Sequence, residues 1–358
     1  MKKKIAVTTN HPAAYMDILF DALGSEFELT VFYNKKKSAE KLWKKQEFYD
    51  GTFIPTISLY ALLRSLFQRD FVIVSGWSSR VNVMIIFYLI IIRKPFAIFS
   101  DVPDDQNITP TKTFLKKMFF RFIPYLFVTG KTGVEHFRKF YNVPEKKMRI
   151  FPYTVRIPTS GEIDEINRHR NEALLLKKDE KIRIFIANRF IERKGYKTLL
   201  RAFERLKKNG CLENFSIKIA GSGEQYERYV EAFGRISQQI ELLHWIEVEH
   251  YKRLIKSMDV FIHASLFEPY GIPVLDVMGH GKLIIASDGV MSAVDLIENG
   301  TNGFLYHGSD DQELYTLLKK IHDRRAMIYE IGHNARKDSS RFAVYNHIEC
   351  LKSLLRYG

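Results

Sequence analysis

The sequence of 358 residues is poor in cysteine and has no long hydrophobic run. Two cysteines, Cys211 and Cys350, cannot form the disulfide framework of a small secreted domain, and they fit a reducing compartment. The longest apolar block covers residues 83–92, whereas about 20 residues are needed to span a bilayer. We therefore expect a buried helix there. The start, MKKKIAVTTN, lacks the apolar core of a signal peptide and is interpreted as a first strand.

Two common kinds of site are also missing from the sequence. The expected strand ends carry no paired histidines and no Asp-x-Asp motif, so we expect no metal. The segment IAGSGEQYERYV has two glycines of a dinucleotide fingerprint, Gly221 and Gly223, but not the third, which argues against a nicotinamide cofactor. These glycines either let the backbone approach a ligand or make a tight turn.

Positive charge is plentiful but unevenly distributed. The net charge is +14, and residues 1–160 hold 25 Lys and Arg against 13 Asp and Glu, so this half supplies +12 of it. Such asymmetry is typical of a protein with an anionic partner: phospholipid, nucleic acid or an acidic substrate. Solvated basic faces that serve solubility are the alternative interpretation.

Short apolar runs alternate with helical stretches along the whole chain, which predicts parallel sheets covered by helices on both faces. We predict an α/β protein with two Rossmann-like, doubly wound domains, residues 1–160 and 180–339, that face a central cleft. A charged linker is expected over 159–179, and a helix over about 340–358 is expected to pack back onto the first domain. The expected strands are residues 4–10, 27–33, 70–76, 95–101 and 125–130, then 183–189, 215–223, 240–246, 259–265, 282–289 and 303–308.

Ligands of doubly wound sheets bind beyond the carboxyl ends of the strands, so the loops that follow strands are candidate sites. In ANRFIERKGYKTLL the expected strand leads to Arg189, and Lys194 closes the loop before an amphipathic helix. An arginine can hold a diphosphate through two parallel hydrogen bonds, and a nearby lysine offsets more of its charge. Basic residues are also common in exposed loops that bind nothing.

The richest loop is SLFEPYGIPVLDVMGHG. Pro269 and Gly271 predict a turn, and Pro273 suits the first position of a helix, where exposed backbone amides favour phosphate. Asp276 is a carboxylate on an otherwise apolar helix, and a buried carboxylate needs a donor: a backbone amide, a basic side chain or ligand hydroxyls. Glu268 lies at the turn, closer to the expected cleft. The two carboxylates either bind a ligand or cap the local structure.

Taken in order, these segments resemble the retaining, nucleotide-sugar-dependent glycosyltransferases of family 4, which have the GT-B fold. The resemblance covers residues 181–325 and rests on ANRFIERKGYKTLLRAF, on IAGSGEQYERY, and on the run from IELLHWIEVEH through SLFEPYGIPVLDVMGHG to NGTNGFLY. Several motifs in matching order and separation are more specific than any one of them. In the first half the resemblance is architectural.

The resemblance implies roles for residues in a donor site. The family's basic pair, which holds the donor diphosphate as it leaves, matches Arg189 and Lys194. The first of its two glutamates, near the transferred sugar, matches Glu268. The second, which holds the ribose hydroxyls, matches Asp276, whose side chain is one methylene shorter. The implied catalytic residues are Arg189, Lys194, Glu268 and Asp101, and the implied donor-binding residues are Gly221, Gly223, Glu268, Pro269, Tyr270, Gly271, Ile272, Pro273 and Asp276.

The acceptor side is less closely matched. Relatives often have a His-Asp pair after the fourth strand, and Ser100 and Asp101 stand there in this sequence. Asp101 either orients the acceptor hydroxyl or caps its loop, and we assign it with His11, from the first loop, to acceptor binding. The family's Pro-Asn-Gly segment is Pro152-Tyr153-Thr154 here.

The function implied by the resemblance is retaining, metal-independent transfer of a sugar from a nucleotide sugar to a hydroxyl of a glycan or lipid-linked acceptor, in cell-surface polysaccharide synthesis. No cofactor is expected beyond the nucleotide sugar as co-substrate. The alternative is a basic nucleic-acid- or membrane-binding protein of GT-B fold without transferase activity. Because no nucleic-acid-binding module is recognisable in the sequence, we expect no nucleic-acid partner.

The basic first half also predicts a location. Relatives that build surface glycans often rest on the cytoplasmic face of the membrane, and KTFLKKMFFRFIPYLF, residues 112–127, combines lysines with aromatic residues, as interfacial helices do. We therefore expect a cytoplasmic protein that is peripheral on the inner face of the cell membrane and contacts its anionic surface. A buried crossover helix with a solvated basic edge is the other interpretation of this segment.

Overall fold

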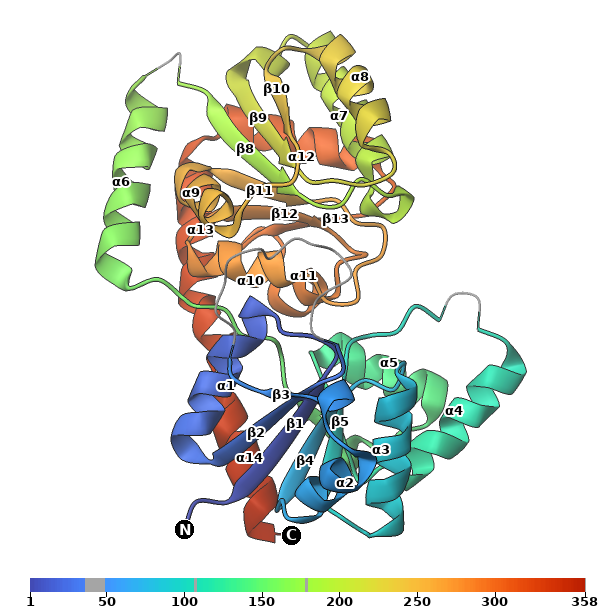
Figure 1. Ribbon diagram of the computed structural model, residues 1–358. Coiled ribbons are helices and arrows are strands. Elements are labelled where there is room, and N and C mark those ends of the chain that lie inside the picture. The colour runs from blue at the N-terminus through green and yellow to red at the C-terminus, as the bar shows by residue number, and fades with distance from the viewer. Residues whose placement is uncertain (36–48, 106–107, 178–179, 358) are drawn as a thin grey trace. The chain divides into compact units, whose positions relative to one another are not determined.

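The computed structural model describes residues 1–35, 49–105, 108–177 and 180–357. It divides into two compact units, residues 1–155 with 342–358 (unit 1) and residues 156–341 (unit 2). Each unit is a parallel β-sheet with helices on both faces (Figure 1). The predicted α/β class with two doubly wound, Rossmann-like domains is therefore confirmed.

The sheet of unit 1 has the order β3-β2-β1-β4-β5-β6-β7, and every pairing is parallel. Strands β3 and β7 were not predicted, because two or three residues are too few to show an alternating pattern. The strands are β1 (Lys4–Thr9), β2 (Glu28–Tyr33), β3 (Thr52–Phe53), β4 (Phe71–Ser75), β5 (Phe96–Ser100), β6 (Tyr125–Val128) and β7 (Met148–Ile150).

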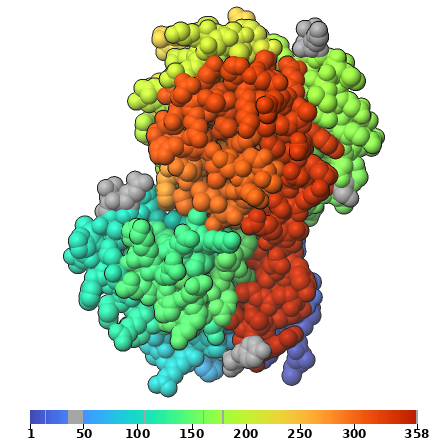
Figure 2. Space-filling model, turned by 180° about the vertical axis from the view of Figure 1, so that it is seen from behind, coloured from blue at the N-terminus to red at the C-terminus, as the bar shows by residue number. Residues whose placement is uncertain are grey.

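Successive strand residues of unit 1 face opposite layers of helices. Ile5 and Val7 of β1 lie in the core under α1 (Ala14–Glu26) and α14 (Tyr345–Tyr357), whereas Ala6 lies in the core under the other layer. Figure 2 shows α14, in red, on the surface of unit 1, where Lys352 pairs with Glu26 of α1 at 2.9 Å. The other layer comprises α2 (Leu59–Phe67), α3 (Arg80–Ile91), α4 (Pro110–Phe122) and α5 (Lys131–Tyr141).

The apolar block over 83–92 lies almost entirely in α3, and the expectation that it is buried is correct for one face only. Ile85, Ile86 and Leu89 are buried against the sheet, but other apolar residues of this helix are exposed. The helix has too little polar character on either side for its sequence to show which face is covered.

The sheet of unit 2 has the order β10-β9-β8-β11-β12-β13 and is also entirely parallel. All six strands fall within or next to the runs predicted for them. The strands are β8 (Ile182–Ala187), β9 (Phe215–Ala220), β10 (Ile240–Leu243), β11 (Val260–His263), β12 (Leu283–Ser287) and β13 (Phe304–Tyr306). The helices are α6 (Ser160–Leu176), α7 (Tyr196–Lys208), α8 (Tyr226–Ile236), α9 (Val248–Ser257), α10 (Ile272–Gly279), α11 (Met291–Leu296), α12 (Asp311–Asp323) and α13 (Ala326–Asp338).

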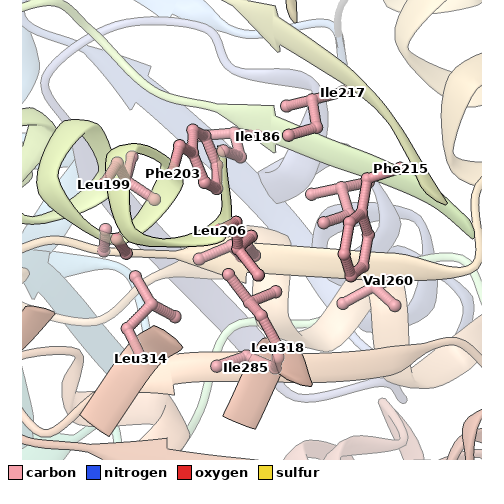
Figure 3. Packing of buried hydrophobic residues seen from close by; sticks show 14 of the residues in the cluster. Ile186, Leu199, Phe203, Leu206, Phe215, Ile217, Val260, Ile285, Leu314 and Leu318 are labelled. Atoms are coloured by element: carbon pink, nitrogen blue, oxygen red, sulfur yellow. The ribbon is translucent and has the colours of Figure 1, made fainter. Parts of the chain in front are cut away.

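The core of unit 2 is built by helices with apolar residues at helical spacing. Leu199, Phe203 and Leu206 form one face of α7, and Figure 3 shows them facing the strands and the α12 residues Leu314 and Leu318. Truncating a buried leucine of this kind to alanine costs about 2–5 kcal/mol. The core therefore fixes the strands, and with them the loops at their carboxyl ends.

The segment 159–179, interpreted above as a linker, contains helix α6, which lies within unit 2. Its inner face carries Ile163, Asn167, Arg170 and Leu174 at spacings of four, three and four residues. Asn167 donates to the carbonyl of His280 at 2.9 Å, and Arg170 binds both carboxylate oxygens of Asp259 at 2.8 Å. Polar anchors on this inner face explain why the sequence pattern did not reveal an amphipathic helix.

Candidate functional site

The strand order of unit 2 reverses between β8 and β11, which are neighbours in the sheet. Loops that leave the carboxyl ends of strands at such a reversal diverge to opposite faces, and ligands of doubly wound folds bind there. The β8 loop carries Arg189 and Lys194, and the β11 loop carries Glu268. Three of the predicted site residues thus come from the two loops at this reversal.

The β8 loop holds its two basic residues in different environments. Arg189 is exposed, whereas Lys194 is buried. The loop turns at Gly195, whose φ is +71°, and a Cβ atom there would lie 1.8 Å from the carbonyl oxygen of Ala264. Only glycine lets the loop pack this closely on the end of β11, and this packing brings Lys194 against the loop that follows.

Lys194 and Glu268 form an ion pair across 74 positions of sequence. Their side chains are 6% and 19% exposed. Burial lowers the pKa of Lys194, and Glu268 opposes this effect. Burial also acts to raise the pKa of Glu268, but the ammonium of Lys194 holds that pKa below its usual range. The carboxylate therefore stays ionised at neutral pH in a largely dry site.

His263 is a site residue that sequence reasoning missed. It is the last residue of β11, it is buried, and burial lowers its pKa to about 4, so the imidazole is neutral at physiological pH. Its Nδ1 atom lies 3.4 Å from Nδ2 of Asn188 in the β8 loop. The sequence signal that could have revealed it is a histidine within the apolar run DVFIHAS, just before the richest loop.

The turn before α10 is tied to the loop after β12. Gly271 has a φ of +103°, and a Cβ atom there would meet Val290 at 2.7 Å. The amide of Glu268 donates to the carbonyl of Gly289 at 2.8 Å, and the Ser292 hydroxyl donates to the carbonyl of Gly271 at 2.9 Å. These contacts fix the start of α10 at Ile272, one residue before the predicted start.

The other predicted residues of this turn contribute mainly backbone. The ring of Tyr270 is buried, and its carbonyl accepts a hydrogen bond from the amide of Ser292 at 2.8 Å. Pro269, Ile272 and Pro273 are partly exposed. Together they set the path of the chain into α10.

Asp276 lies one turn into α10, beside Tyr251 of α9. Burial raises its pKa to about 7, an effect that the Tyr251 hydroxyl and the charge of Lys252 oppose. Asp276 therefore keeps its proton to a higher pH than Glu268 does. The two predicted carboxylates lie in opposite electrostatic environments because a lysine is paired with only one of them.

Gly221 and Gly223 pack against the β8 loop. A Cβ atom on Gly221 would lie 1.8 Å from the carbonyl oxygen of Asn188, and one on Gly223 would lie 2.5 Å from that of Phe190. Both glycines have a φ of +156°. The two glycines therefore let the loop after β9 pack closely on the backbone of the β8 loop, and this packing supports the loop that carries Arg189.

The predicted acceptor residues lie at the carboxyl edge of the sheet in unit 1. Asp101 follows β5, and His11 follows β1. The hydroxyl of Tyr153 donates to a carboxylate oxygen of Asp101 at 3.2 Å. The Tyr153 ring is held edge-to-face between Phe99 at 5.2 Å and Tyr15 at 5.3 Å, so its hydroxyl has a fixed direction.

The described residues contain neither a candidate metal site nor a candidate membrane-spanning helix. Among them, no group of three or more His, Cys, Asp or Glu side chains could hold a metal ion. No helix in the same part of the chain combines the length and the apolar character needed to cross a membrane.

Residues 167–338 match the family model described as glycosyl transferases group 1. The matched residues all lie in unit 2. An uncharacterised glycosyltransferase of Methanocaldococcus jannaschii is 28% identical over 218 residues, which cover 58% of this chain and 53% of that protein. Sucrose-phosphate synthase 4 of Arabidopsis thaliana is 26% identical over 125 residues, which cover 35% of this chain and 11% of that protein. The matches thus span about half or less of these curated relatives.

Solved structures extend the similarity of fold to the whole chain. HepE from Anabaena, solved with UDP-glucose, has a TM-score of 0.74 at 16% identity, covering 99% of this chain and 100% of HepE. Sucrose-phosphate synthase from Thermosynechococcus elongatus has a TM-score of 0.71 at 14% identity and covers 100% of both chains. The predicted GT-B fold is thereby confirmed, and with the family match it supports a glycosyltransferase.

Proposed function

We propose that this protein is a retaining glycosyltransferase that moves a sugar from a nucleotide sugar to a hydroxyl of a glycan or lipid-linked acceptor. The observation that carries the proposal is the buried Lys194–Glu268 pair, on the two loops where the strand order of a glycosyl transferase domain reverses. HepE, which shares the fold, was solved with UDP and with UDP-glucose, and this favours a nucleotide sugar as donor.

In the proposed reaction, unit 2 stabilises the diphosphate as it leaves. As the bond between the anomeric carbon and the phosphate oxygen breaks, negative charge grows on that oxygen. Arg189 can bind two oxygens of the leaving diphosphate through two parallel hydrogen bonds. Lys194 has three donor hydrogens, of which the pair with Glu268 takes one. A cation already in place in a dry site stabilises this charge more than a mobile surface lysine does.

The two carboxylates, Glu268 and Asp276, bind the remaining parts of the donor. Glu268, held ionised by Lys194, accepts a hydrogen bond from a hydroxyl of the transferred sugar. Asp276 accepts from the ribose hydroxyls once it is ionised. In unit 1, Asp101 orients the acceptor hydroxyl; its oxygen attacks the anomeric carbon while its proton passes to the phosphate oxygen that leaves, and His11 contributes to acceptor binding. No step in this scheme calls for a metal or for a cofactor beyond the nucleotide sugar.

We further propose that the acceptor belongs to cell-surface polysaccharide synthesis and that the protein works on the inner face of the cell membrane. The concentration of positive charge in residues 1–160 supports an anionic surface as partner. Nucleic acid is not part of the proposal, because no nucleic-acid-binding module is recognisable in the sequence.

The test is a thermal-shift panel of UDP, GDP, dTDP and CMP with their sugars. We expect one nucleoside diphosphate to stabilise the chain and Arg189→Ala to abolish the shift. Arg235→Ala is the matched control, because the Arg235 side chain forms an exposed pair with Glu231 on the same helix. Equal shifts in Arg189→Ala and wild type would refute the diphosphate assignment. A wild-type chain that binds the nucleotide but does not release nucleoside diphosphate from the nucleotide sugar, and an Asp276→Glu variant that does release it, would instead indicate a GT-B protein that has lost transferase activity.

A further inference from the structure

Exposed apolar side chains gather on one side of unit 1. Of the nineteen large hydrophobic residues that are exposed in the described part of the chain, ten lie on α2, α3 and α4. We call the outward side of these three helices the α2–α4 face. It is made of Leu59, Tyr60 and Phe67 on α2, Met84, Phe87 and Ile91 on α3, and Phe114, Leu115, Met118 and Phe122 on α4.

The spacing on each helix shows that these residues form stripes. On α3, Met84, Phe87 and Ile91 are three and four residues apart, so they lie on one side of the helix. Phe87 is 54% exposed and Ile91 is 78% exposed. On α4, Leu115 and Phe122 repeat the pattern, and Phe120 is the one residue of this helix that is buried among those described. Helix α4 therefore presents most of its apolar residues outward.

The three helices are joined into one face. The Tyr88 hydroxyl of α3 donates to the carbonyl of Leu63 in α2 at 3.1 Å, and Lys94 donates to the carbonyl of Phe67 at 2.7 Å. Trp77, just before α3, packs edge-on against Phe120 of α4 with ring centres 5.0 Å apart. Figure 1 shows all three helices on the same side of the first sheet.

The charge of this face has one sign. Helices α2, α3 and α4 contain six Lys and Arg residues and no Asp or Glu. The side chain of Asp105, in the loop before α4, is 4% exposed and already pairs with Lys116 at 2.8 Å and with His136 at 2.8 Å. It therefore adds little negative charge to the surface.

We infer that the α2–α4 face is the surface by which this protein docks on an anionic lipid bilayer, with the stripes of α3 and α4 in the interface. Exposed apolar patches of this extent mark interaction sites. Basic side chains on helices that contain no acidic residue are complementary to anionic headgroups, and long basic side chains can reach the headgroups while their stems lie along the apolar surface. A protein partner would be expected to leave some acidic residues on such a face, whereas a bilayer selects against them. The proposal deepens the membrane location proposed above but stands on different residues from the donor site.

The experiment is co-sedimentation of the full chain with vesicles of phosphatidylglycerol and phosphatidylcholine, and with vesicles of phosphatidylcholine alone. We expect binding to the mixed vesicles that weakens with salt, and a loss of at least about tenfold in the double variant Phe87→Ser/Ile91→Ser, from the apolar area withdrawn from water. Arg121→Gln is expected to reduce binding about fivefold, on the mixed vesicles only.

Leu175→Ser/Leu176→Ser is the matched control, because these residues on α6 of unit 2 are 53% and 82% exposed but lie outside the face. It is expected to bind like wild type. Equal loss in both double variants, or equal binding to the two kinds of vesicle, would overturn the proposal. So would a wild-type dimer that Phe87→Ser/Ile91→Ser converts to a monomer, because a second copy would then cover the face. The thermal shift by nucleoside diphosphates tests the donor site separately, and it should be the same in wild type and in all the variants of this experiment. A chain that binds vesicles but no nucleotide would refute the proposed function and leave the docking surface standing.

Discussion

Replacing Lys194 by methionine should destabilise unit 2 by leaving a buried carboxylate without its cation. Methionine keeps most of the volume of the side chain, so the change isolates charge from packing. Removing one partner of a buried ion pair costs about 3–5 kcal/mol, and because Glu268 is 19% exposed we expect the lower end, about 3 kcal/mol at pH 7. The double variant Lys194→Met/Glu268→Gln should regain most of this loss.

The pH dependence provides a second check, because the two single variants should respond in opposite directions. In Lys194→Met, burial raises the pKa of Glu268 above its unfolded value. The loss of stability is then full above the new folded pKa and disappears as the pH falls toward the unfolded pKa. In Glu268→Gln, burial lowers the pKa of Lys194 further. That loss is present below the folded pKa and disappears as the pH rises toward the unfolded pKa of lysine.

Urea unfolding followed by tryptophan fluorescence measures these effects. Trp245 is the single tryptophan in residues 156–341, so a background with Trp43 and Trp77 replaced by phenylalanine reports on unit 2 alone. A cost below about 1 kcal/mol for Lys194→Met, or a double variant as unstable as the sum of the two single variants, would refute the buried pair as the electrostatic centre of the site.

Two further predictions concern the other carboxylates. Asp276→Asn should be more stable than wild type at pH 8 and equal to it near pH 4. The raised pKa of Asp276 destabilises the fold increasingly as the pH rises from the unfolded pKa to about 7, by about 1.4 kcal/mol for each pH unit. Chemical denaturation at several pH values measures this difference, and a difference that does not depend on pH would contradict the prediction. Tyr153→Phe should lower turnover, measured as release of nucleoside diphosphate, by about tenfold, because it loses the hydrogen bond to Asp101, and it should not change the thermal shift by the diphosphate. The control Tyr345→Phe, on the exposed start of α14, should leave turnover and thermal shift unchanged. An unaltered turnover in Tyr153→Phe would show that this hydrogen bond does not position Asp101.

The sequence predicted the strands of unit 2 well because each is a buried parallel strand bounded by polar residues or glycine. The run from Asp259 to Ser265 contains all of β11, and the run from Lys282 to Gly289 contains all of β12. The two-residue strand β3 was missed because it pairs with β2 only through Phe32 and Tyr33, a tertiary contact that leaves no local pattern. The exposed stripe of α3 was missed for a related reason, since an apolar helix does not reveal which side is uncovered.

The site shows the same division between local and long-range information. The Pro-Tyr-Gly turn and the helix start could be read from neighbouring residues, because proline and glycine have strong local preferences. The pairing of Lys194 with Glu268 and the burial of His263 depend on how the β8 and β11 loops pack through Gly195, and no spacing in the sequence encodes that contact. This packing places a lysine beside Glu268, whereas burial dominates at Asp276, so the pKa values of the two carboxylates move in opposite directions.

The return of α14 to unit 1 has a consequence for the order in which a ribosome can complete this protein. Leu351 is fully buried in the core that α14 shares with α1, so the part of α1 that packs against α14 stays uncovered until residues 345–357 have been made. Unit 2 is continuous in sequence and has all of its residues once position 341 emerges. Unit 1 therefore closes its core only after all of unit 2 has been made, and until then it exposes apolar surface to which a chaperone can bind.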